Sequence, residues 1–375
     1  MENDAMTEQE LEKALRTAAE ADVAVIFAGL PEIFESEGYD RTSMKLPQCQ
    51  DRLIEEVLKV QPNVVVVLHN GSPVELPWAD KVSAILEMYL GGQGVGEACD
   101  RLLYGEANPS GRLAETFPYR LEDNPSYLHF PGNGKRVLYG EDIFVGYRYY
   151  DTKKVLVRYA FGHGLSYTEF AYGDLNLSSA QMTDEDILTV SFKVKNTGKT
   201  EGKEVVQLYV ADLCGISERP VKELKGFAKV HLLPGEEKTV SMEILARDLS
   251  YYEERLGDWY APSGTYRILI GHASDDIRLH ADIVFETQKE LPFRVDFTTT
   301  FGELLDHTKT APVITELLAP LAAAAASAEG MSDEYKKLGE QVIREMPMKS
   351  LLGQMPGEPV SYTHLRAHET TLPLV

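Results

Sequence analysis

Residues 23–41 read Val23-Ala-Val-Ile-Phe-Ala-Gly-Leu-Pro-Glu-Ile-Phe-Glu-Ser-Glu-Gly-Tyr-Asp-Arg41. An apolar run leads into a loop in which Glu35, Glu37, Asp40 and Arg41 place four charges within seven residues. A short, uniformly apolar run is typical of a strand buried in a parallel sheet, and such sheets bind ligands beyond the carboxyl ends of their strands. The stretch therefore predicts a buried strand that ends at a candidate site.

Helix and strand patterns alternate around this stretch, from Thr7 to about Pro118. Thr7 and Glu10 have the spacing of a capping box, and the apolar residues that follow repeat at helical intervals. Short apolar strands between amphipathic helices indicate an α/β domain with a mostly parallel sheet covered on both faces, and incomplete because only three strands are visible. The expected elements are the strands Val23–Ala28, Val64–His69 and Ser83–Tyr89 and the helices Gln50–Lys59 and Gly94–Tyr104.

A different pattern begins near Phe170, after a Gly-, Pro- and Tyr-rich stretch without a clear period that is expected to form an extended connection. Turn signals such as Asn196-Thr-Gly198 and Leu233-Pro-Gly-Glu236 separate short alternating runs, which indicates an antiparallel β-sandwich. The expected strands are Leu188–Asn196, Val205–Asp212, Leu224–Leu233, Lys238–Leu245, Trp259–Tyr260, Gly264–His272 and Leu279–Phe285.

The composition limits the classes of partner. A formal net charge of −22 disfavours binding to nucleic acid or to an anionic membrane, and no apolar run approaches the roughly 20 residues of a membrane span. The three cysteines show no Cys-x-x-Cys spacing, so we expect neither a metal site nor a cofactor and interpret them as thiols in a reducing compartment. Since the first residues do not resemble a signal peptide, the sequence predicts a cytoplasmic protein.

The C-terminal region turns helical and polar after about Glu290, and its run Ala322–Ala326 indicates low complexity or a helix without a fixed face. The last piece, Val360-Ser-Tyr-Thr-His-Leu-Arg-Ala-His-Glu-Thr370, matches an in-frame translation of a sequencing adapter. We therefore expect residues 360–375 to contribute nothing to the fold, and the chain to be a fragment of a longer gene product.

The charged loop holds the strongest candidates for chemistry. Glu35 and Glu37 could transfer protons if one of them stays protonated near neutral pH. The alternative is solvated loop charge, with Arg41 tying the loop down through an ion pair.

Other motifs are weaker. Gly91-Gly-Gln-Gly-Val-Gly96 fits a tight passage from strand to helix better than a phosphate-binding loop. His69, His163 and His272 lack metal-ligand spacing, and no Gly-x-Ser-x-Gly occurs. One aromatic cluster could stack on a sugar but is more typical of packing between domains; it comprises Tyr139, Phe144, Tyr147, Tyr149 and Tyr150.

Six stretches follow one another along the chain: Glu35-Ser-Glu-Gly-Tyr-Asp-Arg41 with Leu46-Pro47, Asn70-Gly-Ser-Pro-Val-Glu75, Tyr89-Leu-Gly-Gly-Gln93, Tyr104-Gly-Glu-Ala-Asn-Pro-Ser-Gly-Arg-Leu113 with Thr116-Phe-Pro118, Tyr139-Gly-Glu-Asp-Ile-Phe-Val-Gly-Tyr-Arg-Tyr149 and Phe161-Gly-His-Gly-Leu-Ser-Tyr167. In this order they resemble the C-terminal half of glycoside hydrolase family three, the β-glucosidases and β-xylosidases. The sandwich, with Val205-Val-Gln-Leu-Tyr-Val210 and Glu223-Leu-Lys-Gly-Phe227, is similar to the fibronectin type III-like domain of that family, and the resemblance spans about residues 10–290.

The resemblance implies a retaining mechanism on a terminal β-linked sugar, in which one carboxylate attacks the anomeric carbon and a second protonates the leaving oxygen and later activates water. In the family the nucleophile is an aspartate on a (β/α)8 barrel that precedes this region, and the acid/base is a glutamate on a loop of the α/β domain. Glu37, directly before Gly38-Tyr-Asp40, matches that glutamate, and Glu35 is the alternative. No substrate-binding residue is assigned, because those residues would lie on the barrel.

The expected protein is thus a fragment of a retaining β-glucosidase that acts on terminal non-reducing β-D-glucosyl residues, contributes the acid/base loop and is inactive alone. Its partners would be a β-linked glucoside or oligosaccharide and the missing barrel. A non-catalytic carbohydrate- or partner-binding module is the alternative, and specificity for glucoside, xyloside or arabinoside stays open. The expected segments are an α/β sandwich domain (1–120), an extended connection (121–169), a fibronectin type III-like domain (170–290), a helical extension (291–359) and an adapter-derived tail (360–375).

Overall fold

The computed structural model describes residues 4–215, 218–326 and 332–352. The chain forms two compact units, Met1–Lys289 and Glu290–Val375. The tail attributed to an adapter, residues 360–375, lies outside the described residues.

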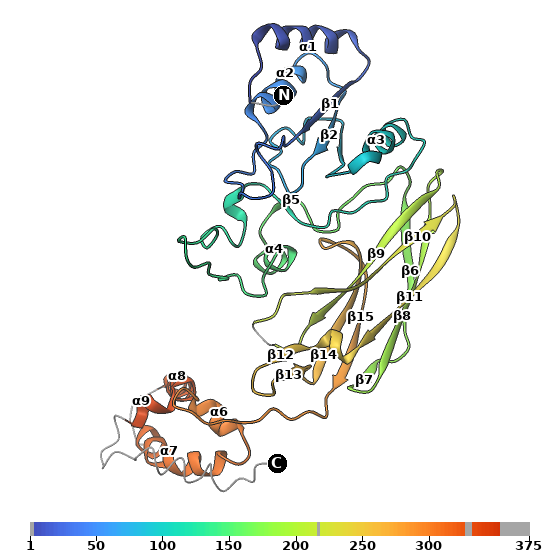
Figure 1. Cartoon of the computed structure of the whole chain (residues 1–375). Coiled ribbons are helices and arrows are strands. Elements are labelled where there is room, and N and C mark those ends of the chain that lie inside the picture. The colour runs from blue at the N-terminus through green and yellow to red at the C-terminus, as the bar shows by residue number, and fades with distance from the viewer. Residues whose placement is uncertain (1–3, 216–217, 327–331, 353–375) are drawn as a thin grey trace. The chain divides into compact units, whose positions relative to one another are not determined.

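The first unit begins with an α/β domain whose three strands form a parallel sheet in the order β1-β2-β3 (Figure 1). Helix α1 starts at the predicted capping box, in which Thr7 and Glu10 bond reciprocally. The sheet confirms the expected α/β class, and boundaries differ from the predicted ones by a few residues. The elements are α1 (Glu8–Glu20), β1 (Ala24–Gly29), α2 (Gln48–Val57), β2 (Val64–His69), β3 (Ala84–Glu87), η1 (Gly92–Gly94) and α3 (Val95–Leu103).

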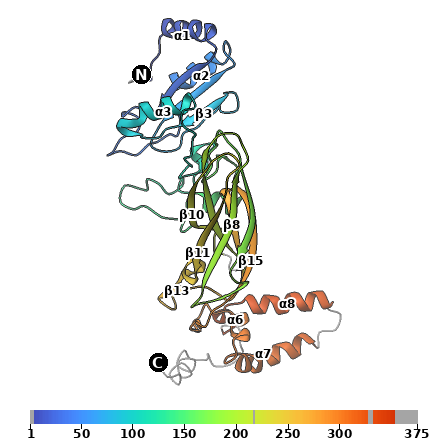
Figure 2. The same cartoon turned by 90° about the vertical axis from the view of Figure 1, so that its right-hand side faces the viewer.

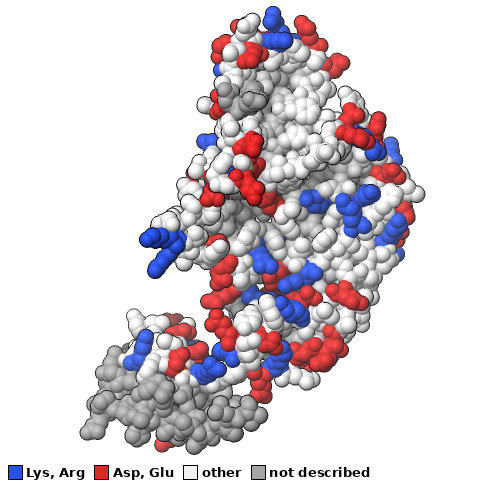
Figure 3. All heavy atoms as spheres, viewed as in Figure 1, with Lys and Arg blue, Asp and Glu red and all other residues white. Residues whose placement is uncertain are grey.

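Strand β1 differs from the prediction of a strand covered on both faces. β2 is largely buried, whereas β1 is an edge strand in which side chains alternate between the core and solvent. Val25 and Phe27 are 42% and 61% exposed, and Figure 3 shows an uncharged surface in this region. A uniformly apolar run cannot reveal which of its side chains lacks a covering helix.

The segment 121–169, predicted as an extended connection, contains η2 (Leu121–Asp123), α4 (Tyr147–Lys153) and β5 (Val157–Tyr159). β5 pairs with β4 (Phe117–Pro118), which lies just before the segment. Of the aromatic cluster, Tyr147 stacks on Phe161 with ring centroids 4.7 Å apart and meets Tyr209 of the sandwich edge-on at 5.9 Å. Tyr147 therefore packs between domains, whereas Tyr139 is 78% exposed.

The sandwich consists of a five-stranded sheet, β10-β9-β14-β15-β7, and a three-stranded sheet, β11-β8-β6 (Figure 2). Pairing is antiparallel except between β15 and β7. Inward side chains such as Phe192, Leu208 and Ile268 form its core. The strands are β6 (Phe170–Leu177), β7 (Gln181–Thr183), β8 (Ile187–Asn196), β9 (Gly202–Asp212), β10 (Glu223–Leu232), β11 (Glu237–Leu245), β14 (Gly264–Ala273) and β15 (Asp276–Glu286), with α5 (Ala246–Leu249) and the hairpin β12 (Tyr251–Glu253) and β13 (Asp258–Tyr260) beside them.

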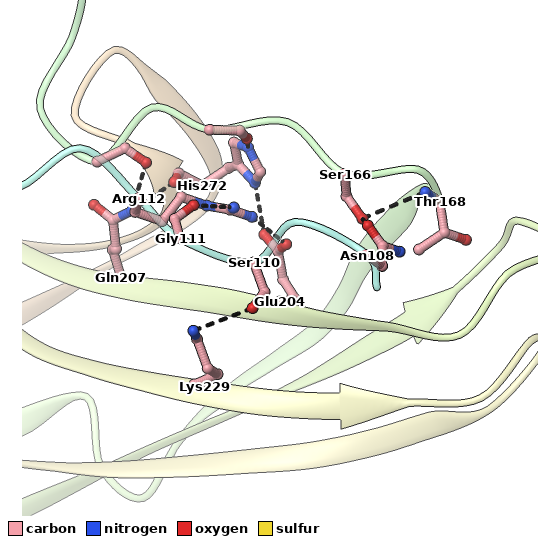
Figure 4. Close-up of polar contacts among 12 residues, drawn as sticks. Asn108, Ser110, Gly111, Arg112, Ser166, Thr168, Glu204, Gln207, Lys229 and His272 are labelled. Carbon is pink, nitrogen blue, oxygen red and sulfur yellow. Dashed lines mark hydrogen bonds and ion pairs between the residues drawn. The ribbon is translucent and has the colours of Figure 1, made fainter. Parts of the chain in front are cut away.

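A buried polar network joins the α/β domain to the sandwich (Figure 4). The Arg112 guanidinium pairs with the Glu204 carboxylate at 2.7 Å, and their side chains are 6% and 0% exposed. The Tyr172 hydroxyl also donates to Glu204, at 2.6 Å. His272 lies with Nδ1 2.6 Å from Glu204 and Nε2 2.8 Å from the Gly164 carbonyl. Both ring nitrogens of His272 therefore lie within hydrogen-bonding distance of an oxygen.

Amide side chains extend this network between the α/β domain and the sandwich. Asn108 accepts from the Ser166 hydroxyl at 2.9 Å and donates to the Glu201 carbonyl at 2.9 Å. Gln207 of β9 donates to the Gly162 carbonyl at 3.3 Å. Two of the stretches on which the family resemblance rests, 104–113 and 161–167, therefore meet on the sandwich.

The second unit is helical. It contains α6 (Phe301–Asp306), α7 (Ala311–Ala326), α8 (Asp333–Glu345) and α9 (Met348–Leu352) around a small core that includes Phe301, Leu304, Ile314 and Met348. The run Ala322–Ala326 lies in α7. Across the described parts of both units, no helix combines the length and apolar character that a membrane crossing requires.

Candidate active site

The charged loop lies at the carboxyl end of the parallel sheet. It follows β1, and the turn Asn70–Pro73 follows β2 at the same edge because the two strands are parallel. In Figures 1 and 2 the segment after β1 projects from one side of the α/β domain, and Figure 3 shows acidic atoms in this region. This edge is where α/β sheets present their functional groups.

Glu35 is bonded internally at both carboxylate oxygens. Its Oε2 accepts from the backbone N–H of Gly71, and its Oε1 accepts from the Ser72 hydroxyl at 2.6 Å. Arg41 Nη1 lies 3.2 Å from the same Oε1, and the two side chains are 19% and 16% exposed. Glu35 therefore fastens the loop to the turn after β2.

Arg41 holds the other end of the loop. Its Nη1 donates to the Ser72 hydroxyl at 2.6 Å and to the Pro73 carbonyl at 3.4 Å, in addition to Glu35. The sequence predicted that an arginine ion pair could tie the loop down, and the structure identifies Glu35 as its partner. The neighbouring Asp40 is exposed.

Glu37 contrasts with Glu35, although the two are only two positions apart. Its side chain is exposed, and no hydrogen bond or ion pair within the described residues reaches its carboxylate. Gly38 follows with φ of 99°, a left-handed conformation that favours glycine and turns the chain sharply. The Tyr39 hydroxyl then donates to the Glu32 carbonyl across the loop. The loop thus presents Glu37 to its surroundings.

Buried polar groups lie behind the loop. Asn70, which is fully buried, donates to the Ser72 carbonyl at 3.0 Å and to Glu87 Oε2 at 3.3 Å, and the Tyr89 N–H donates to Glu87 Oε1 at 2.8 Å. Burial raises the pKa of Glu87 to about 7 despite these donors. Burial also raises the pKa of Glu115, helped by the negative charge of Glu35.

Two of these groups have unused hydrogen-bonding capacity. Asn70 Oδ1 and the Tyr89 hydroxyl are buried without a hydrogen-bond partner among the described residues. Tyr89 also has φ of 48°, which is uncommon for a residue with a side chain. No role for Asn70, Ser72 or Glu87 followed from the sequence, although the motif Asn70-Gly-Ser-Pro-Val-Glu75 contains the first two.

The weaker motifs have structural roles. The glycine run spans η1 and the start of α3, and a side chain at Gly91 would collide with Val95. His69 stacks on Phe27, and His163 stacks on Tyr159 with ring centroids 5.0 Å apart. Within residues 4–215, 218–326 and 332–352, no group of three or more His, Cys, Asp or Glu side chains is placed to hold a metal ion.

This arrangement suits proton transfer. An exposed carboxylate on a fixed loop can donate a proton to a group that approaches it and take one back. A carboxylate whose two oxygens are already engaged, as in Glu35, is less available to an external group. An α/β domain with such a loop, followed by a β-sandwich, agrees with the glycoside hydrolase resemblance seen in the sequence.

Comparisons with known proteins identify the family. Residues 1–167 match the glycosyl hydrolase family 3 C-terminal domain, and residues 204–274 match a fibronectin type III-like domain. The chain belongs to glycosyl hydrolase family 3 and aligns with the C-terminal half of its β-glucosidases. This confirms the resemblance and the fold class inferred from the sequence.

Two relatives agree with this assignment. Thermostable beta-glucosidase B of Acetivibrio thermocellus is 47% identical over 357 residues, which cover 95% of this chain and 47% of that protein. A β-glucosidase of Kluyveromyces marxianus is 45% identical over 76% of this chain and 33% of its own length. The chain therefore spans half or less of the length of these relatives.

Solved structures show the same fold. The GH3 β-glucosidase of Bifidobacterium adolescentis superposes with a TM-score of 0.76 and 38% identity, over 83% of this chain and 46% of that one. The Kluyveromyces marxianus β-glucosidase in complex with glucose superposes with a TM-score of 0.71 and 43% identity, over 75% of this chain and 34% of that one.

Proposed function

We propose that this chain supplies Glu37 as the general acid/base of a retaining β-glucosidase that acts on terminal non-reducing β-D-glucosyl residues. The observation that carries the proposal is the contrast within one loop. Glu37 is exposed and unbonded at the carboxyl end of β1, directly before Gly38, whereas Glu35 is held by three protein donors. The membership in family 3 and the names of the relatives support the substrate class.

The proposed chemistry needs two carboxylates. Glu37 would protonate the glycosidic oxygen as the aglycone leaves and then remove a proton from the water that hydrolyses the glycosyl-enzyme intermediate. The nucleophile would be an aspartate on a (β/α)8 barrel outside this chain, as the family resemblance implies. Without it, the chain would bind no sugar productively and would be inactive alone.

We also place the protein in the cytoplasm. This proposal is supported by the odd number of cysteines and by the thiol state of Cys99 and Cys214.

Azide rescue tests the assignment of Glu37. The chain would be joined to the N-terminal half of thermostable beta-glucosidase B of Acetivibrio thermocellus, and Glu37→Ala and Glu35→Ala would be compared. Azide attacks the glycosyl-enzyme without losing a proton, so it should restore turnover of Glu37→Ala and yield a β-glucosyl azide. Rescue of Glu35→Ala with none for Glu37→Ala would reverse the assignment within the loop.

A further inference from the structure

We infer that Glu35, Arg41 and Gly71 form a clasp that positions Glu37, so that Glu35 is a positioning residue of the active site. The inference rests on the proposed role of Glu37. It concerns residues that do not touch the substrate and act through the shape of the loop.

The clasp closes the loop on itself. Glu35 and Arg41 are six positions apart and form an ion pair of 3.2 Å, so residues 36–40 form a short closed loop that carries Glu37. Both anchors also reach the turn after β2, through Gly71, Ser72 and the Pro73 carbonyl. The loop is therefore fixed at its two ends to a rigid part of the sheet.

The side chains of the clasp suit this role. Both oxygens of Glu35 accept hydrogen bonds, so an amide in its place would put an NH2 group against a donor. The side chain is 19% exposed, where an ion pair is screened less than at the surface. To reach a substrate, Glu35 would have to break bonds to Gly71, Ser72 and Arg41, which argues against a direct chemical role.

Gly71 contributes to the clasp through its backbone N–H, which donates to Glu35 Oε2. A Cβ atom at this position would lie 3.1 Å from Glu35 Oε2 and 3.2 Å from its Cδ. This is tighter than ordinary van der Waals contact, so the carboxylate would have to move by a few tenths of an ångström. Gly71 thus permits the backbone N–H to approach Glu35.

Positioning has a catalytic value. A reacting group must lie within a fraction of an ångström of its productive place, and a misplacement of about 1 Å can cost about 100-fold in rate. Gly38, with φ of 99°, would let the loop sample other shapes if its ends were released. The clasp removes this freedom.

Hydrogen exchange on the 375-residue chain tests the clasp without any catalysis. Glu35→Gln and Gly71→Ala should each speed exchange of the Phe34 and Glu35 amides, which donate to the Pro31 carbonyl, by 10-fold or more. Glu35→Gln should also speed exchange of the Gly71 amide, which donates to Glu35. Exchange in the sandwich and the melting temperature should change little. Glu32→Gln is the matched control, because it makes the same change of charge in the same loop at an exposed side chain, and it should leave exchange unchanged. Unchanged exchange of the Phe34 and Glu35 amides in both clasp variants would overturn the inference.

The assembled enzyme gives a second readout. With the N-terminal half of the Acetivibrio thermocellus relative attached, Glu35→Gln and Gly71→Ala should lower kcat 10-fold to 100-fold with a smaller change in KM. Neither should give a glucosyl azide. An azide product from Glu35→Gln would make Glu35 the acid/base and would overturn the positioning role. If exchange responds as expected but Glu37→Ala is fully active, the proposed function fails while the clasp stands.

Discussion

Arg112 and Glu204 form an ion pair of 2.7 Å that is almost completely shielded from solvent, between the α/β domain and strand β9 of the sandwich. Tyr172 and His272 bond to the same carboxylate, which therefore has donors on both oxygens. A buried carboxylate is tolerated when it is paired and hydrogen-bonded in this way. The contact between the α/β domain and the sandwich is thus a hydrogen-bonded network centred on Glu204. Each of its side chains compensates the burial of that carboxylate.

Removing one partner of this pair should be costly. Arg112→Met leaves Glu204 buried with reduced compensation, so the free energy of unfolding should fall by about 3–5 kcal/mol. Arg267→Met is the control, since Arg267 pairs with Asp282 at 2.6 Å on the surface. This substitution should lower the free energy of unfolding by less than about 1 kcal/mol. Urea denaturation measures both. Equal, small effects of the two variants would contradict the importance of the buried pair.

Gly162 should tolerate no side chain. It has φ of 83°, and a Cβ atom there would overlap the buried amide of Gln207. Gly162→Ala should therefore lower stability by about 1–3 kcal/mol, the usual cost of a strained backbone position.

Gly173 provides a matched control in β6. A Cβ atom there would meet no atom within 4 Å, so Gly173→Ala should change the free energy of unfolding by less than about 0.5 kcal/mol. Thermal denaturation of the two variants under one buffer condition separates them. If Gly173→Ala lowers the free energy of unfolding as much as Gly162→Ala does, the space around these glycines does not decide their tolerance of a side chain.

Glu87 should make stability depend on pH. Its pKa is raised from 4.5 to about 7 by burial, so the folded chain keeps a proton that the unfolded chain releases. The contribution of Glu87 to the free energy of unfolding is therefore fully present below about pH 4.5. It is lost as the pH rises to about 7, and the loss is at most about 3 kcal/mol. Asp51, whose pKa is raised to about 6, acts in the same direction.

Glu87→Gln should remove most of this dependence. The amide stays neutral, so the difference in unfolding free energy between pH 5 and pH 8 should shrink relative to the unchanged chain. Glu243→Gln, at an exposed position of β11, should leave that difference as it is. Urea denaturation at the two pH values is the measurement, and an unaltered pH slope in Glu87→Gln would refute the assignment to Glu87.

The order of fold classes was predictable because it depends on local periodicity. Alternating strands from about residue 188 and apolar runs between helices gave the α/β domain and the sandwich, and the Thr7 capping box fixed the first helix. Helix α4 was missed, because its seven residues are too short for a periodic signal and are held by the packing of Tyr147 on Phe161 and Tyr209. Tertiary contacts of this kind have no local signature.

The candidate site was predictable only in part. The sequence placed Glu35 and Glu37 in one loop at a strand end, and left open which of them is the acid/base. Their different environments arise from Gly71 and Ser72, more than 30 positions away, which the parallel pairing of β1 and β2 brings to the loop. Neither spacing nor charge in the loop indicates these partners.

The 375-residue chain by itself should not hydrolyse an aryl β-glucoside. An acid/base residue cannot form the glycosyl-enzyme intermediate without a nucleophile, and loss of one member of a catalytic pair removes most of the rate enhancement. The release of nitrophenol by the purified chain, compared with a buffer blank, is the measurement. Turnover that survives further purification would show that the chain contains a complete site.

Leaving-group dependence should distinguish Glu37 in the assembled enzyme. A poor leaving group needs a proton as it departs, so Glu37→Ala should lower kcat/KM on alkyl glucosides by about 10²–10⁴-fold. A dinitrophenyl leaving group departs without a proton, so the kcat/KM of the same variant should fall less than about 10-fold on that substrate.

Deglycosylation in Glu37→Ala lacks its base. The covalent intermediate should therefore accumulate, and the dinitrophenyl substrate should show a burst of released dinitrophenol. Glu32→Gln, an exposed change in the same loop, should leave turnover of both substrates unaffected. If Glu37→Ala slows the two substrates equally, Glu37 does not act as the proton donor.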